Sequence, residues 1–132
     1  MTAFVDTFAL IAWLNPRDDA HTVVTSYLDG FTGRLLTTEW VLMELADALS
    51  APEARSTAVA FLQAVRADAL FDVVGYVPSM YQAGFDLFAT RPDKAWSLTD
   101  CISFAVMIER KLSEALTADH HFEQAGFRAV FK

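Results

Sequence analysis

The hydrophobic pattern opens with a short apolar run, Phe4-Val5, that stops at a charged residue, Asp6. A second apolar series follows at once with helical spacing, at Phe8, Ile11 and Ala12. The first run is typical of a strand buried on both faces, and its immediate turn into a helix is typical of a β–α unit. Ligands of such folds bind beyond the carboxyl ends of the strands, where we expect Asp6 to lie.

The same alternation continues to the end of the chain. Apolar runs bounded by turn residues predict further strands at about 34–37, 70–74, 115–117 and 127–131. Helical spacing, N-capping residues and Pro or Gly stops predict helices at about 7–15, 18–28, 38–50, from 52 onward, 78–90, 97–111 and 119–124. This order predicts an α/β fold with a parallel five-stranded sheet and helices on both faces.

Length and composition fit one domain, 1–132. The chain has 132 residues, of which 54% are hydrophobic and 20% charged, so it can bury a sizeable core and is not disordered. Cys101 is the only cysteine, which excludes an internal disulfide and a two-cysteine zinc or redox motif. No basic leader and no apolar stretch of ~18 residues is present, so we expect a cytoplasmic protein without a membrane segment.

The formal net charge is -7, which argues against a broad, non-specific grip on nucleic acid. It does not exclude a nuclease, because carboxylates gathered around a metal ion add negative charge that the cation offsets locally. An acidic surface would also suit a basic protein partner.

Three acidic residues stand where a strand or loop passes into a helix. Asp6 and Asp119 each follow a predicted strand, where an ordinary N-cap explains them equally well. Asp100 follows Ser97 at the spacing of a capping box, and for this residue alone the cap is the better interpretation. Each position would nevertheless place its carboxylate at the same edge of a parallel sheet.

Glu44 is the most informative acid. It borders the apolar stripe that Val41, Leu45 and Ala48 form on the helix predicted at 38–50. A charge beside a buried face needs a partner, either an arginine in a salt bridge or a metal ion. Four carboxylates at one edge would repel one another and raise each other's pKa, and a hard cation such as Mg²⁺ or Mn²⁺ removes that cost.

Four short motifs, in this order and spacing, together resemble one known family. They are Val5-Asp6-Thr7, the run from Thr37 to Glu44, Ser97-Leu98-Thr99-Asp100-Cys101, and the run from Leu116 to Phe122 followed by Gly126-Phe127. Over essentially its whole length the chain resembles PIN-domain ribonucleases, specifically the VapC toxins of VapBC toxin–antitoxin modules. The resemblance implies a three-layer α/β/α fold with a mainly parallel five-stranded sheet.

The resemblance also implies an activity and partners. It places an acidic, catalytic Mg²⁺ or Mn²⁺ site on four residues and small hydroxyl residues beside it, namely Asp6, Glu44, Asp100, Asp119, Thr7 and Thr117. The implied reaction is metal-dependent hydrolysis of RNA phosphodiester bonds. The implied partners are a second copy of the chain and a cognate antitoxin whose tail covers the site. The chain departs from the family at Phe8, where serine is frequent.

Several other residues have two interpretations. Arg91 and Lys94 precede Asp100 in a polar loop and are candidates for holding an RNA backbone, although a solvated loop explains them too. The pair His120-His121 invites a catalytic interpretation, but a structural role on a short helix is favoured.

Other functions fit the sequence less well. A haloacid dehalogenase-type phosphatase needs a second acid two residues after Asp6, where Phe8 stands. A receiver-like domain needs an acid pair and a later lysine, which are not evident. The remaining rival is a catalytically silent PIN-like protein-interaction module, and the presence of all four acids argues against it.

Overall fold

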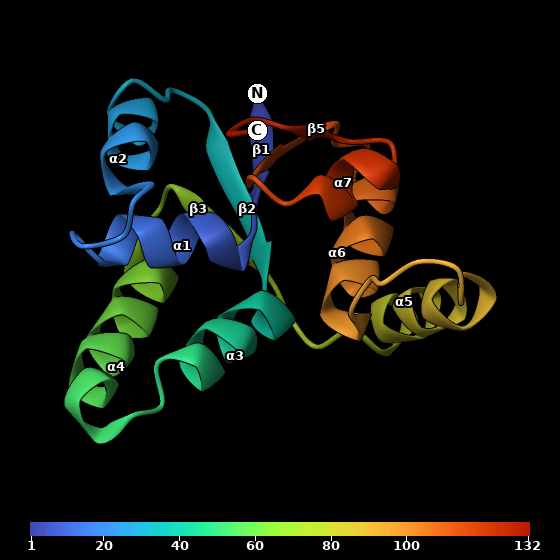
Figure 1. Cartoon of the computed structure of the whole chain (residues 1–132), viewed down its shortest axis with the longest axis horizontal. Coiled ribbons are helices and arrows are strands. Elements are labelled where there is room, and N and C mark those ends of the chain that lie inside the picture. Colours follow the sequence, from blue (N-terminus) through green and yellow to red (C-terminus); the bar gives the residue numbers. More distant parts are fainter.

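Five parallel strands form one sheet in the order β3-β2-β1-β4-β5 (Figure 1). The computed structural model describes residues 1–132. The strands are β1 (Thr2–Val5), β2 (Arg34–Thr38), β3 (Phe71–Val74), β4 (Glu114–Leu116) and β5 (Arg128–Ala129). The helices are α1 (Thr7–Leu14), α2 (His21–Asp29), α3 (Glu39–Ala48), α4 (Pro52–Ala67), α5 (Pro78–Thr90), α6 (Leu98–Glu109) and α7 (His120–Gln124).

The first strand occupies the centre of the sheet. Phe4 on β1 pairs in register with Leu36 on β2 and with Ala115 on β4. The chain adds β2 and β3 on one side of β1 and then crosses to add β4 and β5 on the other. The strand order therefore reverses next to β1, and such a switch point is the usual ligand site of an open parallel sheet.

Helices cover both faces of the sheet. Figure 1 shows α1, α2 and α4 on one side and α5, α6 and α7 on the other. The helix α3 packs against α1, α4 and α6, so it joins the two helical layers at the carboxyl end of the sheet. This arrangement confirms the predicted three-layer fold. None of the helices combines the length and the apolar character needed to cross a membrane.

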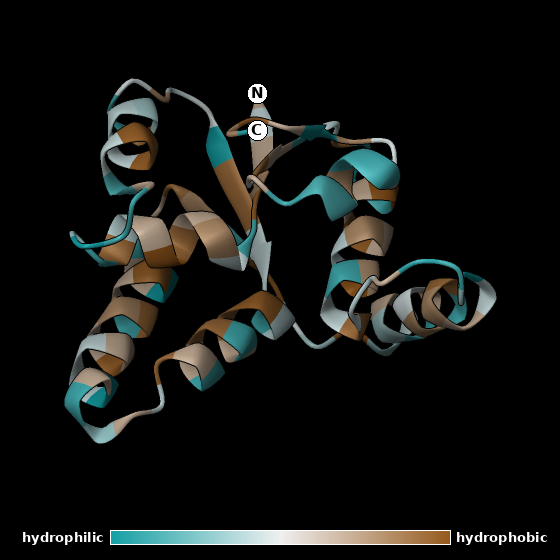
Figure 2. Cartoon of the chain, in the orientation of Figure 1, coloured by the Kyte–Doolittle hydropathy of each residue, from teal (hydrophilic) through white to brown (hydrophobic).

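The core contains many aromatic side chains, and α6 is hydrophobic along most of its length (Figure 2). Phe104 lies at its centre, with ring centroids 5.0 Å from Phe122 and 5.2 Å from Trp96. Every residue of α6 from Cys101 to Met107 is buried. The buried Cys101 agrees with its predicted core position. Because α6 is firmly packed, the position of its first turn is fixed.

The predicted elements are all present, with small shifts at their ends. The last strand is shorter than predicted and contains only Arg128–Ala129. The second helix begins at His21 instead of Asp18, because the Asp18 carboxylate accepts a hydrogen bond from the Ala20 amide in the turn before it (2.8 Å). An acidic residue before a helical series can end a turn as readily as it can open a helix.

Candidate metal centre

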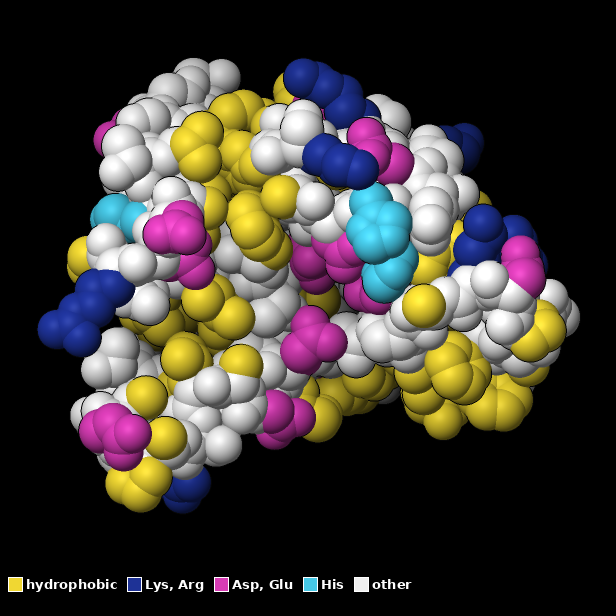
Figure 3. Space-filling model, viewed as in Figure 1, with side chains coloured by type: hydrophobic (Ala, Val, Ile, Leu, Met, Phe, Trp, Pro, Cys, Tyr) yellow, Lys and Arg dark blue, Asp and Glu magenta, His cyan; other side chains and the backbone are white.

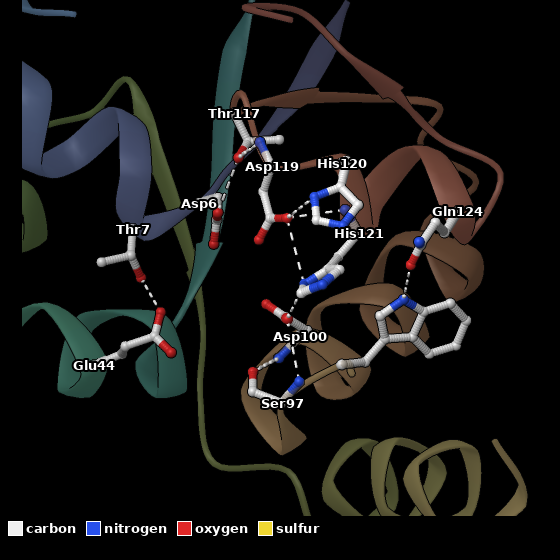
Figure 4. A network of polar contacts seen from close by, with 11 residues as sticks. Asp6, Thr7, Glu44, Ser97, Asp100, Thr117, Asp119, His120, His121 and Gln124 are labelled. Atoms are coloured by element: carbon white, nitrogen blue, oxygen red, sulfur yellow. Dashed lines mark hydrogen bonds and ion pairs between the residues drawn. The ribbon is translucent and has the colours of Figure 1, made fainter. Parts of the chain in front are cut away.

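The four predicted acids meet at the carboxyl end of the sheet (Figure 4). Asp6 follows β1 and Asp119 lies three residues after the end of β4, whereas Glu44 projects from α3 and Asp100 from the first turn of α6. Parallel strands end at the same edge, which is why residues more than a hundred positions apart come together here. The sequence-based grouping of these four acids is therefore reproduced by the structure.

Asp6 is the most deeply buried of the four. Its side chain is only 6% exposed, and its Oδ2 accepts a hydrogen bond from the Thr117 hydroxyl at 3.1 Å. Burial raises the pKa of Asp6 from its ordinary value of 3.8 to about 7, and the carboxylates of Asp100 and Glu44 act in the same direction. Burial and like charges both disfavour the ionised form, so this side chain needs a cation to be charged at low cost.

Glu44 is half-buried and faces α1. Its Oε1 accepts a hydrogen bond from the hydroxyl of Thr7, the first residue of that helix. Burial raises the pKa of Glu44, with further contributions from Asp100 and Asp119 across the site. No arginine pairs with Glu44, so the salt bridge considered from the sequence is not formed.

Asp100 is both a helix cap and a member of the acidic group. Its backbone amide donates to the Ser97 hydroxyl at 3.0 Å, and its Oδ2 accepts from the Ser97 amide at 3.2 Å. This is the capping box that the sequence indicated. The same hydrogen bonds fix the direction of the carboxylate, so Asp100 can cap α6 and belong to the acidic group at the same time. Burial and the nearby Asp119 raise the pKa of Asp100.

Asp119 caps α7 and is held by two neighbours. Its Oδ1 accepts from the His121 amide at 2.9 Å, and its own amide donates to the Thr117 hydroxyl at 3.1 Å. Thr117 therefore serves two acids at once, since the same hydroxyl donates to Asp6. The threonine predicted beside the site fixes the relative position of residues from two strand ends.

The four carboxylates share one pattern of contacts. In each, the protein engages one oxygen and makes no bond to the other, which leaves four oxygens free: Asp6 Oδ1, Glu44 Oε2, Asp100 Oδ1 and Asp119 Oδ2. Every Lys or Arg ion pair in the chain involves other acids. Figure 3 shows acidic side chains gathered near the middle of this face, beside histidine side chains.

The donor set of this group suits a hard divalent cation. Oxygen ligands from several carboxylates are typical of Mg²⁺ and Mn²⁺ sites. Uncompensated carboxylates in a partly buried cluster repel one another, and a bound cation would relieve both the repulsion and the burial cost. We therefore find that the residues fit such a metal ion.

The two basic residues predicted beside the site differ in their contacts. The Arg91 guanidinium pairs with Asp93 at 2.9 Å and lies 5.2 Å from the centre of the Trp96 ring. Lys94 makes no ion pair. Their loop leads into α6 and so into Asp100, but neither side chain contacts the four acids.

His121 lies against two of the four acids. Its Nδ1 lies 3.4 Å from Asp100 Oδ2 and 3.4 Å from Asp119 Oδ1 (Figure 4). A structural role on a short helix was favoured from the sequence, because nothing there shows that α6 and α7 meet at this residue. In the sequence, only its position two residues after Asp119, an acid at a strand end, indicates that His121 lies near the acids.

A family model for the PIN domain matches residues 3–128. The chain is similar to a solved structure of Mycobacterium tuberculosis VapC20, described as a Sarcin-Ricin loop cleaving toxin, with a TM-score of 0.89 and 25% sequence identity over 98% of both chains. No curated protein sequence matches the chain.

Two further structures share the fold at lower identity. VapBC2 from Rickettsia felis, bound to a DNA fragment from its promoter, has a TM-score of 0.69 and 12% identity, covering 96% of this chain and 94% of that one. FitAcB from Neisseria gonorrhoeae has a TM-score of 0.69 and 16% identity, covering 98% and 96%. These two likenesses show the fold alone.

Proposed function

Because this chain belongs to the PIN domain family, we propose that it is an endoribonuclease that hydrolyses RNA phosphodiester bonds with Mg²⁺ or Mn²⁺. The observation that carries the proposal is the group of four carboxylates at the switch point, each with one oxygen held by the protein and one left free. A protein-interaction module gains nothing from crowding four mutually repelling carboxylates into a partly buried site.

The chain's own residues would prepare the site for the cation. The free oxygens of Asp6, Glu44, Asp100 and Asp119 would hold it, while Thr117 and Thr7 fix the directions of Asp6 and Glu44. When bound, a divalent cation activates water for attack and stabilises the negative charge that develops on a phosphate. We propose that Arg91 and Lys94, in the loop before α6, contact the RNA backbone.

We further propose that the enzyme is the toxin of a toxin–antitoxin pair, acts in the cytoplasm and is inhibited by a cognate antitoxin protein. Support comes from the similarity to VapC20 along the whole chain, and from the fold shared with VapBC2 and FitAcB. The similarity to VapC20 makes an RNA that contains the sarcin–ricin loop the first substrate to test.

We also propose that the protein forms a homodimer. The residue before α5 and the outer face of that helix expose a row of large apolar residues at helical spacing, Val77, Tyr81, Phe85 and Phe88, each more than 40% exposed. Figure 3 shows the hydrophobic patch over the position of α5. Contiguous exposed apolar surface of this kind marks protein–protein contact, and a second copy of the chain is the expected partner.

Cleavage of RNA by the purified protein tests the proposal. We expect cleavage that depends on Mn²⁺ and that Asp100→Asn reduces by more than about 100-fold. Mutating a residue that only hydrogen-bonds to a metal ligand already costs about 10–100-fold in activity or metal affinity, and Asp100 is itself a proposed ligand. Asparagine can still accept the Ser97 amide, so the helix cap should survive. The exposed Asp29→Asn variant is the matched control and should cleave normally.

Two results would contradict the proposal. The assignment of the site fails if Asp100→Asn cleaves RNA at the normal rate. A wild-type protein that neither cleaves RNA nor binds Mn²⁺ would instead indicate a silent interaction module.

A further inference from the structure

A second group of metal-ligand side chains lies on the outer side of Asp119. Asp119, His120 and His121 offer one carboxylate oxygen and two imidazole nitrogens, and these atoms all lie within 4.8 Å of one another. The two rings are adjacent, with centroids 4.4 Å apart. Figure 4 shows both imidazoles facing the Asp119 oxygen that points away from Asp6. The proposed nuclease site does not use either ring.

The distances within this group are unusual for hydrogen bonds. His121 Nδ1 lies 3.4 Å from Asp119 Oδ1, and His120 Nδ1 lies 3.7 Å from the same oxygen. His121 Nδ1 is buried and makes no hydrogen bond, although it has two carboxylate oxygens as neighbours. A buried nitrogen without a hydrogen bond is costly, so its position needs an explanation.

The distances within this group are close to those between ligands of one metal ion. Two ligand atoms bound to one tetrahedral Zn²⁺ at the usual bond lengths lie about 3.3 Å apart. The 3.4 Å separation of His121 Nδ1 from Asp119 Oδ1 is close to that value, and His120 Nδ1 lies 3.7 Å from the same oxygen. His120 is 57% exposed at its side chain, so an ion can reach the group from solvent.

We propose that Asp119, His120 and His121 form a site for a divalent transition-metal ion of the Zn²⁺ class, separate from the acidic site. Imidazole ligands suit Zn²⁺, Co²⁺ or Ni²⁺, whereas Mg²⁺ prefers oxygen. The two sites share Asp119 through different oxygens: Oδ1 faces the histidines, and Oδ2 remains free for the acidic group. Water would complete the coordination of the outer ion.

Titration calorimetry with ZnCl₂ tests the proposal, in excess Mg²⁺ that competes with Zn²⁺ for the acidic group. We expect His120→Ala and His121→Ala to weaken Zn²⁺ binding by at least about tenfold. His21→Ala is the matched control, because the Nδ1 of His21 is already engaged with the Ala12 carbonyl at 2.7 Å. That variant should bind Zn²⁺ as the wild type does.

His120→Ala decides the outcome, since this exposed side chain can be removed without disturbing the fold. Equal Zn²⁺ affinity in this variant and in the wild type would overturn the proposal. As a second readout, Co²⁺ should give visible absorption bands of a nitrogen-ligated ion in the wild type and lose them in His120→Ala. Neither measurement uses RNA, so both still test the Zn²⁺ site if the nuclease proposal fails.

Discussion

At the scale of single residues, the site combines carboxylates that are unfavourable to ionise with threonine hydroxyls that orient them. Asp6 and Thr117 show this most directly, because one buried hydroxyl sets the direction of one buried carboxylate. Burial makes the Asp6 carboxylate costly to ionise, whereas the hydrogen bond from the Thr117 hydroxyl offsets part of that cost. The first two predictions concern this balance.

The stability of the metal-free protein should fall as the pH rises from about 4 to about 7. The folded protein holds the Asp6 proton up to about pH 7, whereas the unfolded chain releases it near 3.8. The folded state therefore binds more protons in this interval, and Asp6 lowers the free energy of unfolding by up to about 1.4 kcal/mol per pH unit. Melting temperatures measured in EDTA at pH 5 and pH 8 check this. Asp6→Asn should show a smaller drop, and an identical drop in both proteins would contradict the assignment.

Thr117→Val should destabilise the protein by about 1–3 kcal/mol and weaken Mn²⁺ binding. The change keeps the volume but leaves the buried Asp6 Oδ2 and the Asp119 amide without the hydroxyl that serves both. Denaturant unfolding and calorimetry measure the two effects. Thr25→Val is the matched control: its buried Oγ1 makes no hydrogen bond, so that variant should be as stable as the wild type or more stable. Equal losses in the two variants would show that the Thr117 contacts contribute nothing specific.

At the scale of elements, the position of α6 decides where Asp100 lies. Gly84 of α5 lets the two helices approach closely, since a Cβ at this position would stand 2.4 Å from the Ile102 side chain and 2.7 Å from its Cα. Ile102 lies two residues after Asp100. The packing of α5 on α6 is therefore linked to the geometry of the acidic group.

Gly84→Ala should destabilise the protein by about 1–3 kcal/mol, because the backbone of α6 must move to admit the methyl group. The higher helix propensity of alanine, worth about 1 kcal/mol, opposes this loss without removing it. Chemical denaturation measures the change. Gly75→Ala, where an added Cβ would meet nothing within 4 Å, is the control and should be nearly neutral. A stable Gly84→Ala protein would mean that α5 and α6 can separate freely.

At the scale of the whole molecule, the apolar row on α5 and the acidic group lie on different elements. Phe85→Lys should convert the proposed dimer to a monomer, because a charge in an apolar interface is left without a partner. Light scattering on a sizing column measures the mass. Val59→Lys is the control, since Val59 is similarly exposed (49%) but lies on α4. A wild-type protein that is monomeric at micromolar concentration would contradict the homodimer.

Mn²⁺ should raise the melting temperature of the intact protein, because a ligand that binds only the folded state stabilises it. The Asp6→Asn, Asp100→Asn double variant should lose this rise. A rise that persisted unchanged in the double variant would place the cation elsewhere. In the wild type the metal should also reduce the pH dependence described above, since it neutralises the charges that cause it.

Much of this protein could be predicted from the sequence. The alternation of apolar runs and helical series predicted all five strands, the helices and the parallel sheet, and the strand-end positions of Asp6 and Asp119 placed two acids at one edge. These features depend on local periodicity and capping, which the chain carries in its order of residues. The motifs around the four acids indicated the PIN family, and the family match confirms it.

Tertiary structure decided which atoms meet. Only the packing of α6 against α7 brings His121 to Asp100, and only the crossing of the chain between β3 and β4 brings the Thr117 hydroxyl to Asp6. It also showed that Glu44 has Thr7 and no arginine as its partner. Contacts between residues so distant in sequence depend on how elements dock, and local patterns do not contain that information.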